Sequence, residues 1–174
     1  MLSGMASRTQ NMLVNATRVF LLVIIVAVFL WYNLRPVSRV PEAVQSRTPF
    51  PILVPRDEKI VLSEWRYSAS EKNLTFVATV QGKKVVFTQQ AAPLSYRDDR
   101  AAYDRFIGTL KPTANFQSPL GQVSIFRLVE EESYSPGGDS AILLSSGTLL
   151  IAHPEKAISE DNWISLFRTI RVDD

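Results

Sequence analysis

An unbroken apolar run near the N-terminus constrains this chain more than any other feature. Residues 19–32 are fourteen consecutive apolar or aromatic residues. A helix that crosses the roughly 30 Å hydrocarbon core of a bilayer needs about 20 residues, and extending the run at both ends to residues 12–34 meets that requirement. We therefore predict a single transmembrane helix at residues 12–34, preceded by a cytoplasmic tail at residues 1–11.

The residues at both ends of the predicted span suit the membrane–water interface. Arg18 lies within the first two turns, where its long side chain can reach the lipid headgroups. Trp31 and Tyr32 close the span, and aromatic side chains of this kind are enriched at bilayer interfaces. Arg35 follows on the far side. We expect these four residues to contact the lipid bilayer.

A basic start followed by an apolar core also occurs in cleaved signal peptides. The apolar run ends in Trp31-Tyr32, and the next residues, 33–36, lack the small side chains of a cleavage site. We therefore expect an uncleaved anchor. Positive charges are nearly balanced across the span, but a short tail ahead of such an anchor usually stays in the cytoplasm. We expect a single-pass protein of the cell membrane whose C-terminal domain is extracytoplasmic.

Charge separates the membrane-flanking segment from the remainder of the chain. Residues 1–41 contain four arginines and no acid, whereas residues 42–174 carry a net charge of −2. A nucleic-acid-binding domain needs basic residues clustered on its folded part, so we expect no nucleic-acid partner. The chain contains no cysteine, which excludes disulfides, a thiol nucleophile and a cysteine zinc site.

Proline marks the segment between the anchor and the rest of the chain. Residues 35–55 contain five of the ten prolines. Proline removes amide donors and favours extended neighbours, so we predict a proline-rich linker there that acts as a semi-rigid spacer. Residues 50–54 are apolar enough to pack onto the domain that follows. Residues 56–174 have the length of one ordinary domain.

Period-two alternation of apolar residues predicts strands in this domain. Residues 62–69 and 122–130 are expected to form single strands. Residues 73–90 and 141–152 are expected to form hairpins, because each contains a glycine-bearing turn between two apolar stretches. A loop is predicted at residues 133–139.

Two stretches carry apolar residues at the i, i+3, i+4, i+7 spacing of one helix face. The first helix is expected to begin after Ser95 and the second after Ser159, since serine is a favoured N-cap. The two apolar faces consist of Tyr103, Phe106, Ile107 and Leu110 and of Trp163, Leu166, Phe167 and Ile170. The order strand, hairpin, helix occurs twice. We predict an α+β domain with an antiparallel sheet and two amphipathic helices. The two helices cover either one face of an antiparallel sheet together, or one sheet each.

Reactive residue types form no catalytic or metal-binding pattern. His153 is the only histidine; one histidine cannot build a histidine metal site, and a Ser-His-Asp arrangement needs all three residues together. The acidic runs at residues 98–99 and 130–132 lack the spacing of a calcium loop. We expect no catalytic residue, no metal and no cofactor. Four aromatic residues either line a ligand pocket or belong to the core, which the alternation favours: Trp65, Tyr67, Phe76 and Phe87.

The order of these features resembles a known family. An anchor, a proline-bearing spacer with the segment Pro49-Phe-Pro-Ile-Leu-Val-Pro55, a strand containing Trp65 and a closing amphipathic helix are similar to single-pass envelope proteins found mainly in actinobacteria and related lineages. That family is known only as a domain of unknown function. It usually has glycine before the tryptophan, where this chain has Glu64. The resemblance implies an envelope location and the α+β architecture, and implies no catalytic residues.

Three functions remain open at this point. The first is a non-enzymatic domain that contacts another envelope protein, which the anchor and the lack of a catalytic cluster favour. The second is a carrier or sensor for an apolar ligand such as a lipid, bound in a concavity beside the sheet. The third is an envelope hydrolase, which requires His153 or an acid pair to lie beside a serine.

Overall fold

The computed structural model describes most of the chain beyond residue 37. The described residues are Phe20, 23–26, 38–127, 129–130, 133–134 and 138–173. The chain divides into two compact units, Met1–Val37 and Ser38–Asp174. Within the described ranges, no helix is both long and apolar enough to cross a bilayer.

The predicted anchor at residues 12–34 falls almost wholly outside the described ranges. The same holds for the four residues expected at the membrane interface, Arg18, Trp31, Tyr32 and Arg35. Of the predicted span, Phe20 and residues 23–26 are described; their backbone is helical and their side chains are exposed.

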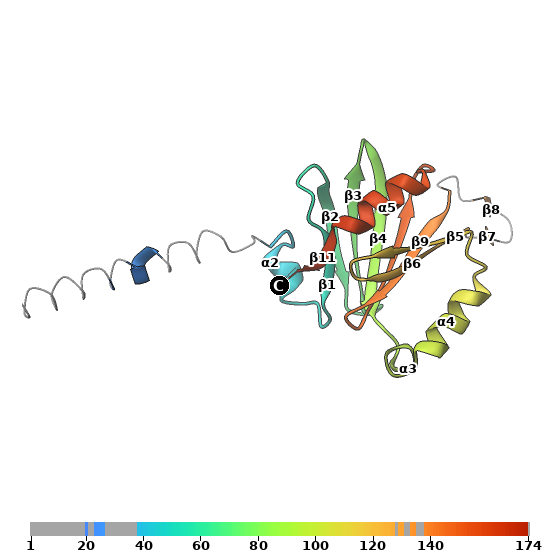
Figure 1. The fold of residues 1–174 in the computed structure, drawn as a ribbon, viewed down its shortest axis with the longest axis horizontal. Helices are drawn as coiled ribbons and strands as arrows, with labels where there is room; N and C mark the ends of the chain where they lie inside the picture. Colours follow the sequence, from blue (N-terminus) through green and yellow to red (C-terminus); the bar gives the residue numbers. More distant parts are fainter. Residues whose placement is uncertain are drawn as a thin grey trace, which may run out of the picture. The chain divides into compact units, whose positions relative to one another are not determined.

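A seven-stranded antiparallel sheet forms the centre of the second unit (Figure 1). Its strands lie in the order β2-β3-β4-β10-β9-β6-β5. Their bounds are β2 Val61–Ser68, β3 Asn73–Val80, β4 Lys83–Ala91, β5 Ala114–Ser118, β6 Gly121–Phe126, β9 Ser140–Ser145 and β10 Thr148–Pro154. Two smaller antiparallel ribbons pair β1 (Ile52–Pro55) with β11 (Ile170–Asp173) and β7 (Val129–Glu130) with β8 (Ser133–Tyr134). The prediction of an α+β domain with an antiparallel sheet is confirmed.

Both predicted hairpins are present and lie side by side in the sheet. They are β3–β4 and β9–β10, and β4 pairs with β10. In each turn two consecutive residues have positive φ: Gln81 and Gly82 in the first, and Ser146 and Gly147 in the second. A two-residue turn with positive φ at both positions matches the right-handed twist of the flanking strands. Because β4 pairs with β10, the strands from both halves of the domain belong to one continuous sheet.

The second half contains strands that the sequence patterns did not predict. β5 pairs with β6 across a two-residue turn, and the predicted strand at residues 122–130 is divided, because β6 ends at Phe126. β8 lies inside the predicted loop at residues 133–139. The C-terminal strand β11 follows directly after the last helix and pairs with β1.

The two predicted amphipathic helices lie on opposite faces of the sheet, not on one face. Consecutive residues of β9 and β10 alternate between two cores: Leu143 and Leu150 belong to the larger core, and Ile142 and Leu149 to the smaller one. Helix α5 (Glu160–Thr169) contributes to the larger core, and α4 (Arg100–Thr109) to the smaller. Figure 1 shows α5 across the sheet and α4 at a distance from α5. The central strands are apolar on both faces, so both faces need cover.

The helix starts are set by side-chain caps. Ser159 accepts a hydrogen bond from the backbone N–H of Asn162, which confirms it as the N-cap of α5. The helix predicted after Ser95 is instead two helices, α3 (Leu94–Asp98) and α4. Asp99 has an extended backbone between them, and its carboxylate accepts from the Ala101 N–H at 2.9 Å. Asp99, and not Ser95, is therefore the N-cap of the amphipathic helix.

The folded unit begins at Ser38, which is earlier than the predicted residue 56. Within the predicted linker at residues 35–55, the structure has a short helix, α2 (Glu42–Gln45), and strand β1. Val40 and Phe50 are buried in the larger core. The prolines do not keep this segment extended and solvated, because its apolar side chains contribute to the same core as the sheet.

Polar contacts fasten the start of this unit to its C-terminal strand. The buried Asp173 carboxylate accepts a hydrogen bond from the Ser38 hydroxyl and forms an ion pair with Arg56 at 2.9 Å. The Arg39 guanidinium donates to three backbone carbonyls, those of Pro55, Asp57 and Ile60. Charge-assisted hydrogen bonds of this kind are stronger than neutral ones. They hold residues 38 and 39 against β1 and β11.

A bulge in β2 places its tryptophan in the core. Between the pairs Ser63–Val77 and Arg66–Thr75, β2 contains one more residue than β3, and Glu64 has a φ of 57°. The Trp65 ring stacks on Phe76 at 4.4 Å between ring centres, and Phe76 stacks on Phe87, which lies beside it on β4, at 4.9 Å. The predicted core assignment is confirmed for Phe76 and Phe87, which are fully buried; Trp65 and Tyr67 are half-buried against them.

The left-handed backbone at Glu64 leads to the first prediction. A β-branched side chain is strained at positive φ, whereas glycine adopts it freely. We expect Glu64→Val to lower the free energy of unfolding by about 1–2 kcal/mol and Glu64→Gly to change it little. Urea unfolding of the full-length protein in detergent micelles measures both. Equal stabilities of the two variants would contradict the left-handed conformation.

A buried side-chain amide connects β1 to the seven-stranded sheet. Gln89 of β4 is fully buried. Its Oε1 accepts a hydrogen bond from the Leu53 N–H at 2.8 Å, and its Nε2 donates to the Leu53 carbonyl at 2.7 Å. Leu53 is itself fully buried, so these two bonds satisfy both polar groups of its backbone. The Gln89 side chain makes the two hydrogen bonds that the backbone of a neighbouring strand would otherwise make.

Removing this amide gives the second prediction. Gln89→Leu leaves the Leu53 N–H and carbonyl buried without a partner, and each such group costs about 1–3 kcal/mol. We expect the free energy of unfolding to fall by at least about 2 kcal/mol, measured by urea titration. The matched control is Gln90→Leu, which changes the exposed neighbour and is expected to have little effect. A loss of equal size in both variants would show that the amide bridge is not the cause.

Candidate functional site

The strands under the C-terminal half of α4 turn polar side chains toward the helix. In β5 and β6, Phe116, Val123 and Ile125 pack against the larger core. Alternation places the residues between them on the opposite face, beside α4: Asn115, Gln117 and Gln122, which are exposed, and Ser124, which is buried. The gap is not filled by apolar packing, and a cavity remains.

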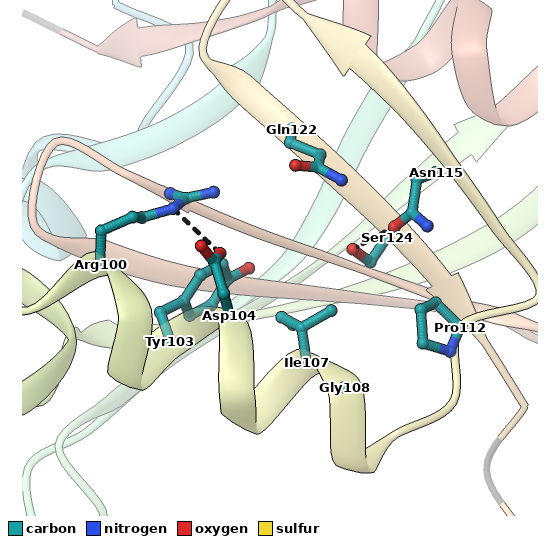
Figure 2. Close-up of a pocket in the computed structure, with 9 residues that line it drawn as sticks. All are labelled: Arg100, Tyr103, Asp104, Ile107, Gly108, Pro112, Asn115, Gln122 and Ser124. Atoms are coloured by element: carbon teal, nitrogen blue, oxygen red, sulfur yellow. Dashed lines mark hydrogen bonds and ion pairs between the residues drawn. The ribbon is translucent and has the colours of Figure 1, made fainter.

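This cavity, the α4 pocket, has a volume of about 240 Å³. Figure 2 shows its two walls facing one another. The lining residues are Arg100, Tyr103, Asp104, Ile107 and Gly108 from α4, then Pro112, and Asn115, Gln122 and Ser124 from the two strands.

Each wall carries an internal polar contact. On the helix, Arg100 Nε donates to Asp104 Oδ1 at 3.1 Å. The Arg100 guanidinium also lies 4.8 Å from the centre of the Tyr103 ring, within the range of a cation–π interaction. On the strands, Ser124 Oγ donates to Asn115 Oδ1 at 2.7 Å. These contacts hold the polar groups in place before any ligand arrives.

Tyr103 is the most unusual residue of the α4 pocket. Its side chain is only 2% exposed, and its hydroxyl has no hydrogen-bond partner among the residues that the structure describes. Burial raises the pKa of Tyr103 to about 12, an effect that the Arg100 guanidinium and a contact with the Leu144 backbone oppose and that the Asp104 carboxylate increases. The Leu144 contact does not reach hydrogen-bond geometry. A buried hydroxyl without a partner costs about 1–3 kcal/mol.

A small apolar core holds α4 against the sheet. Tyr103 and Ile107 pack against Phe126, Ile142 and Leu149. These side chains lie beside the α4 pocket and fix the helix that carries Arg100 and Asp104.

A second hollow, of about 410 Å³, lies on the other side of Arg100. It is lined by Tyr96, Arg97, Arg100, Leu144, Ser145, Ser146 and Gly147. Arg100 therefore belongs to both hollows, and the start of α4 separates them.

A third hollow, of about 400 Å³, lies beside the first turn of α5. Trp163 lines it and has a buried indole N–H without a partner among the described residues. Arg127 and Asp139 form an ion pair at 2.9 Å there. Residues 128 and 135–137, which adjoin it in sequence, lie outside the described ranges, and this hollow is not assigned a function.

The structure brings His153 and a serine together. His153 Nδ1 lies 2.8 Å from Ser140 Oγ, between the neighbouring strands β10 and β9. A catalytic serine must be reached by the substrate, but Ser140 is fully buried. The contact is a part-buried hydrogen bond that satisfies the serine hydroxyl.

The acidic runs serve local structure where they are described. Asp99 caps α4 and pairs with Arg105 at 3.3 Å, while Asp98 ends α3. Of the run at residues 130–132, Glu130 lies in β7 and the other two residues fall outside the described ranges. Among the described residues, no group of three or more acids and histidines is gathered to hold a metal ion.

Sequence reasoning missed the α4 pocket because it missed β5. The signal was present: Ala114 and Phe116 alternate with Asn115 and Gln117, and a proline-bearing turn follows. Only the pairing with β6 shows that the polar side chains of both strands face α4.

Comparisons with protein-family models, with curated proteins and with solved structures found no match to this chain.

The unpaired hydroxyl of Tyr103 gives the third prediction. Tyr103→Phe removes a buried group that has no partner, so we expect equal or higher stability at neutral pH, by up to about 1 kcal/mol. Thermal unfolding of the full-length protein measures this. A loss above about 1 kcal/mol would show that the hydroxyl has a structural partner.

The raised pKa of Tyr103 predicts how stability depends on pH. In the unfolded chain a tyrosine loses its proton near pH 10, whereas folded Tyr103 keeps it until about pH 12. Its contribution is therefore fully present below pH 10 and is lost as pH rises to 12. We expect wild type to lose about 2 kcal/mol more than Tyr103→Phe across this range, measured by urea unfolding at each pH. Parallel losses would contradict the shift.

Proposed function

We propose that this chain is a membrane-anchored binding protein of the cell envelope, which acts without catalysis by holding another envelope component in the α4 pocket. The observation that carries the proposal is the polar lining of the pocket, where the Arg100–Asp104 pair on the helix faces amide and hydroxyl side chains on the strands. Polar groups on two facing walls offer hydrogen-bond donors and acceptors to a ligand. The polar strand residues that keep the pocket open support the same reading.

The proposed location rests on the apolar segment near the N-terminus. Phe20 and residues 23–26 have helical backbone and exposed apolar side chains, as a lipid-facing helix would. The predicted anchor ends at residue 34, and three residues then precede the folded unit. We propose that residues 38–174 form an extracytoplasmic domain tethered to the cell membrane by this segment.

The resemblance to actinobacterial-type envelope proteins of unknown function belongs to this proposal. One structural feature, the backbone conformation of Glu64, supports it. Glu64 stands where that family has glycine, and its backbone is left-handed, the conformation that glycine favours. A glycine before Trp65 would fit the same bulge.

The other two functions have less support. An apolar-ligand carrier needs a predominantly apolar cavity with few polar groups, whereas the α4 pocket combines apolar side chains with an ion pair and two amides. A hydrolase that uses Ser140 needs a route for substrate to a residue that is fully buried.

Site-specific crosslinking in intact cells tests the proposal. A photoreactive amino acid at Gln122, in the full-length protein, is expected to capture the same envelope component in repeated experiments, identified by mass spectrometry. The matched control places it at Gln45, which is exposed in α2 outside the pocket. Asn115→Ala is expected to reduce capture at Gln122. Identical capture at both positions would remove the pocket from the proposal, and capture of cytoplasmic proteins alone would overturn the topology.

A further inference from the structure

We infer that the α4 pocket binds one uncharged sugar unit of an envelope glycan; this rests on the binding function proposed above. The inference comes from the charge, the hydrogen-bonding groups and the size of the pocket.

The charged groups of the pocket already neutralise one another. Arg100 and Asp104 form an ion pair at 3.1 Å on the helix wall. Every other polar residue of the lining is a neutral amide or hydroxyl. A ligand with a net charge would find no unpaired opposite charge among these residues.

The polar groups offer donors and acceptors together. The guanidinium donates, the carboxylate accepts, and the amides of Asn115 and Gln122 do both. Figure 2 shows Arg100 and Asp104 on one side of the pocket and the two amides on the other. Each hydroxyl of a sugar also donates and accepts, and adjacent hydroxyls match planar side chains that offer two atoms at once.

Apolar groups and size favour a single ring. Ile107 and Pro112 line the pocket between the two polar walls and suit the C–H faces of a sugar. Pockets for drug-sized ligands have volumes of roughly 300–1,000 Å³, and this one has about 240 Å³. A peptide backbone is also neutral with donors and acceptors, so a peptide is included among the probes below.

Titration calorimetry of the full-length protein tests the inference, in a detergent without a sugar headgroup. The probes are glucose, galactose, mannose and N-acetylglucosamine as neutral sugars, glucuronate and inorganic phosphate as anions, and trialanine as a peptide. We expect saturable binding of at least one neutral sugar, weakened at least tenfold by Asn115→Ala and by Gln122→Ala. Gln45→Ala, outside the pocket, is expected to leave the affinity unchanged.

The outcomes separate this inference from the proposed function. Tighter binding of glucuronate, phosphate or trialanine than of every neutral sugar would overturn the sugar assignment and leave the pocket as a binding site. Binding of a neutral sugar that neither pocket variant weakens would place it elsewhere and overturn the inference. No binding of any neutral sugar would also overturn it, while crosslinking at Gln122 decides the proposed function on its own.

Discussion

The two hydrogen bonds between Gln89 and Leu53 connect the small ribbon of this domain to its main sheet. β1 has no strand neighbour in the seven-stranded sheet, and its other edge pairs with β11. Since Leu53 is fully buried, its backbone groups can be satisfied only by a partner inside the protein. The Gln89 amide is that partner, and it positions β1, the attached β11 and the helix that leads into β11. Through Asp173, the entry of the chain at Ser38 depends on the same ribbon.

The two faces of the sheet differ in how completely other elements cover them. One face is closed by α5 and the β1–β11 ribbon over a large aromatic and aliphatic core. The other face is covered by α4, with Tyr96 of α3 beside it, over a core with fewer members. Where α4 passes over β5 and β6, amide and hydroxyl side chains replace apolar ones, so the helix stays in place without filling the space below it. Stability comes mainly from the closed face, which leaves the open face available for binding.

Sequence patterns correctly predicted the elements whose geometry depends on residues that are adjacent in sequence. The hairpins at residues 73–90 and 141–152 have turns that require positive φ, and glycine marks them. Ser159 caps α5 as its position before an acidic turn indicated. The same reasoning chose Ser95 where Asp99 is the cap, because a short helix precedes α4 and shifts its start. It also missed β5 and β11, whose few residues gain strand structure from partners that are distant in sequence.

The sequence by itself determined the alternation, the turns, the helix faces and the absence of a catalytic pattern, since each depends on the order of adjacent residues. Tertiary structure decided which residues meet. It placed the helices on opposite faces, drew the proline-bearing segment from Ser38 onward into the core, and brought Asn115 and Ser124 opposite Tyr103. The physical reason is that buried groups are stabilised by contacts with residues that can be distant in sequence, so adjacent residues alone do not identify these partners. For Leu53 that partner is Gln89 in another strand, and for the Tyr103 hydroxyl the described chain supplies none.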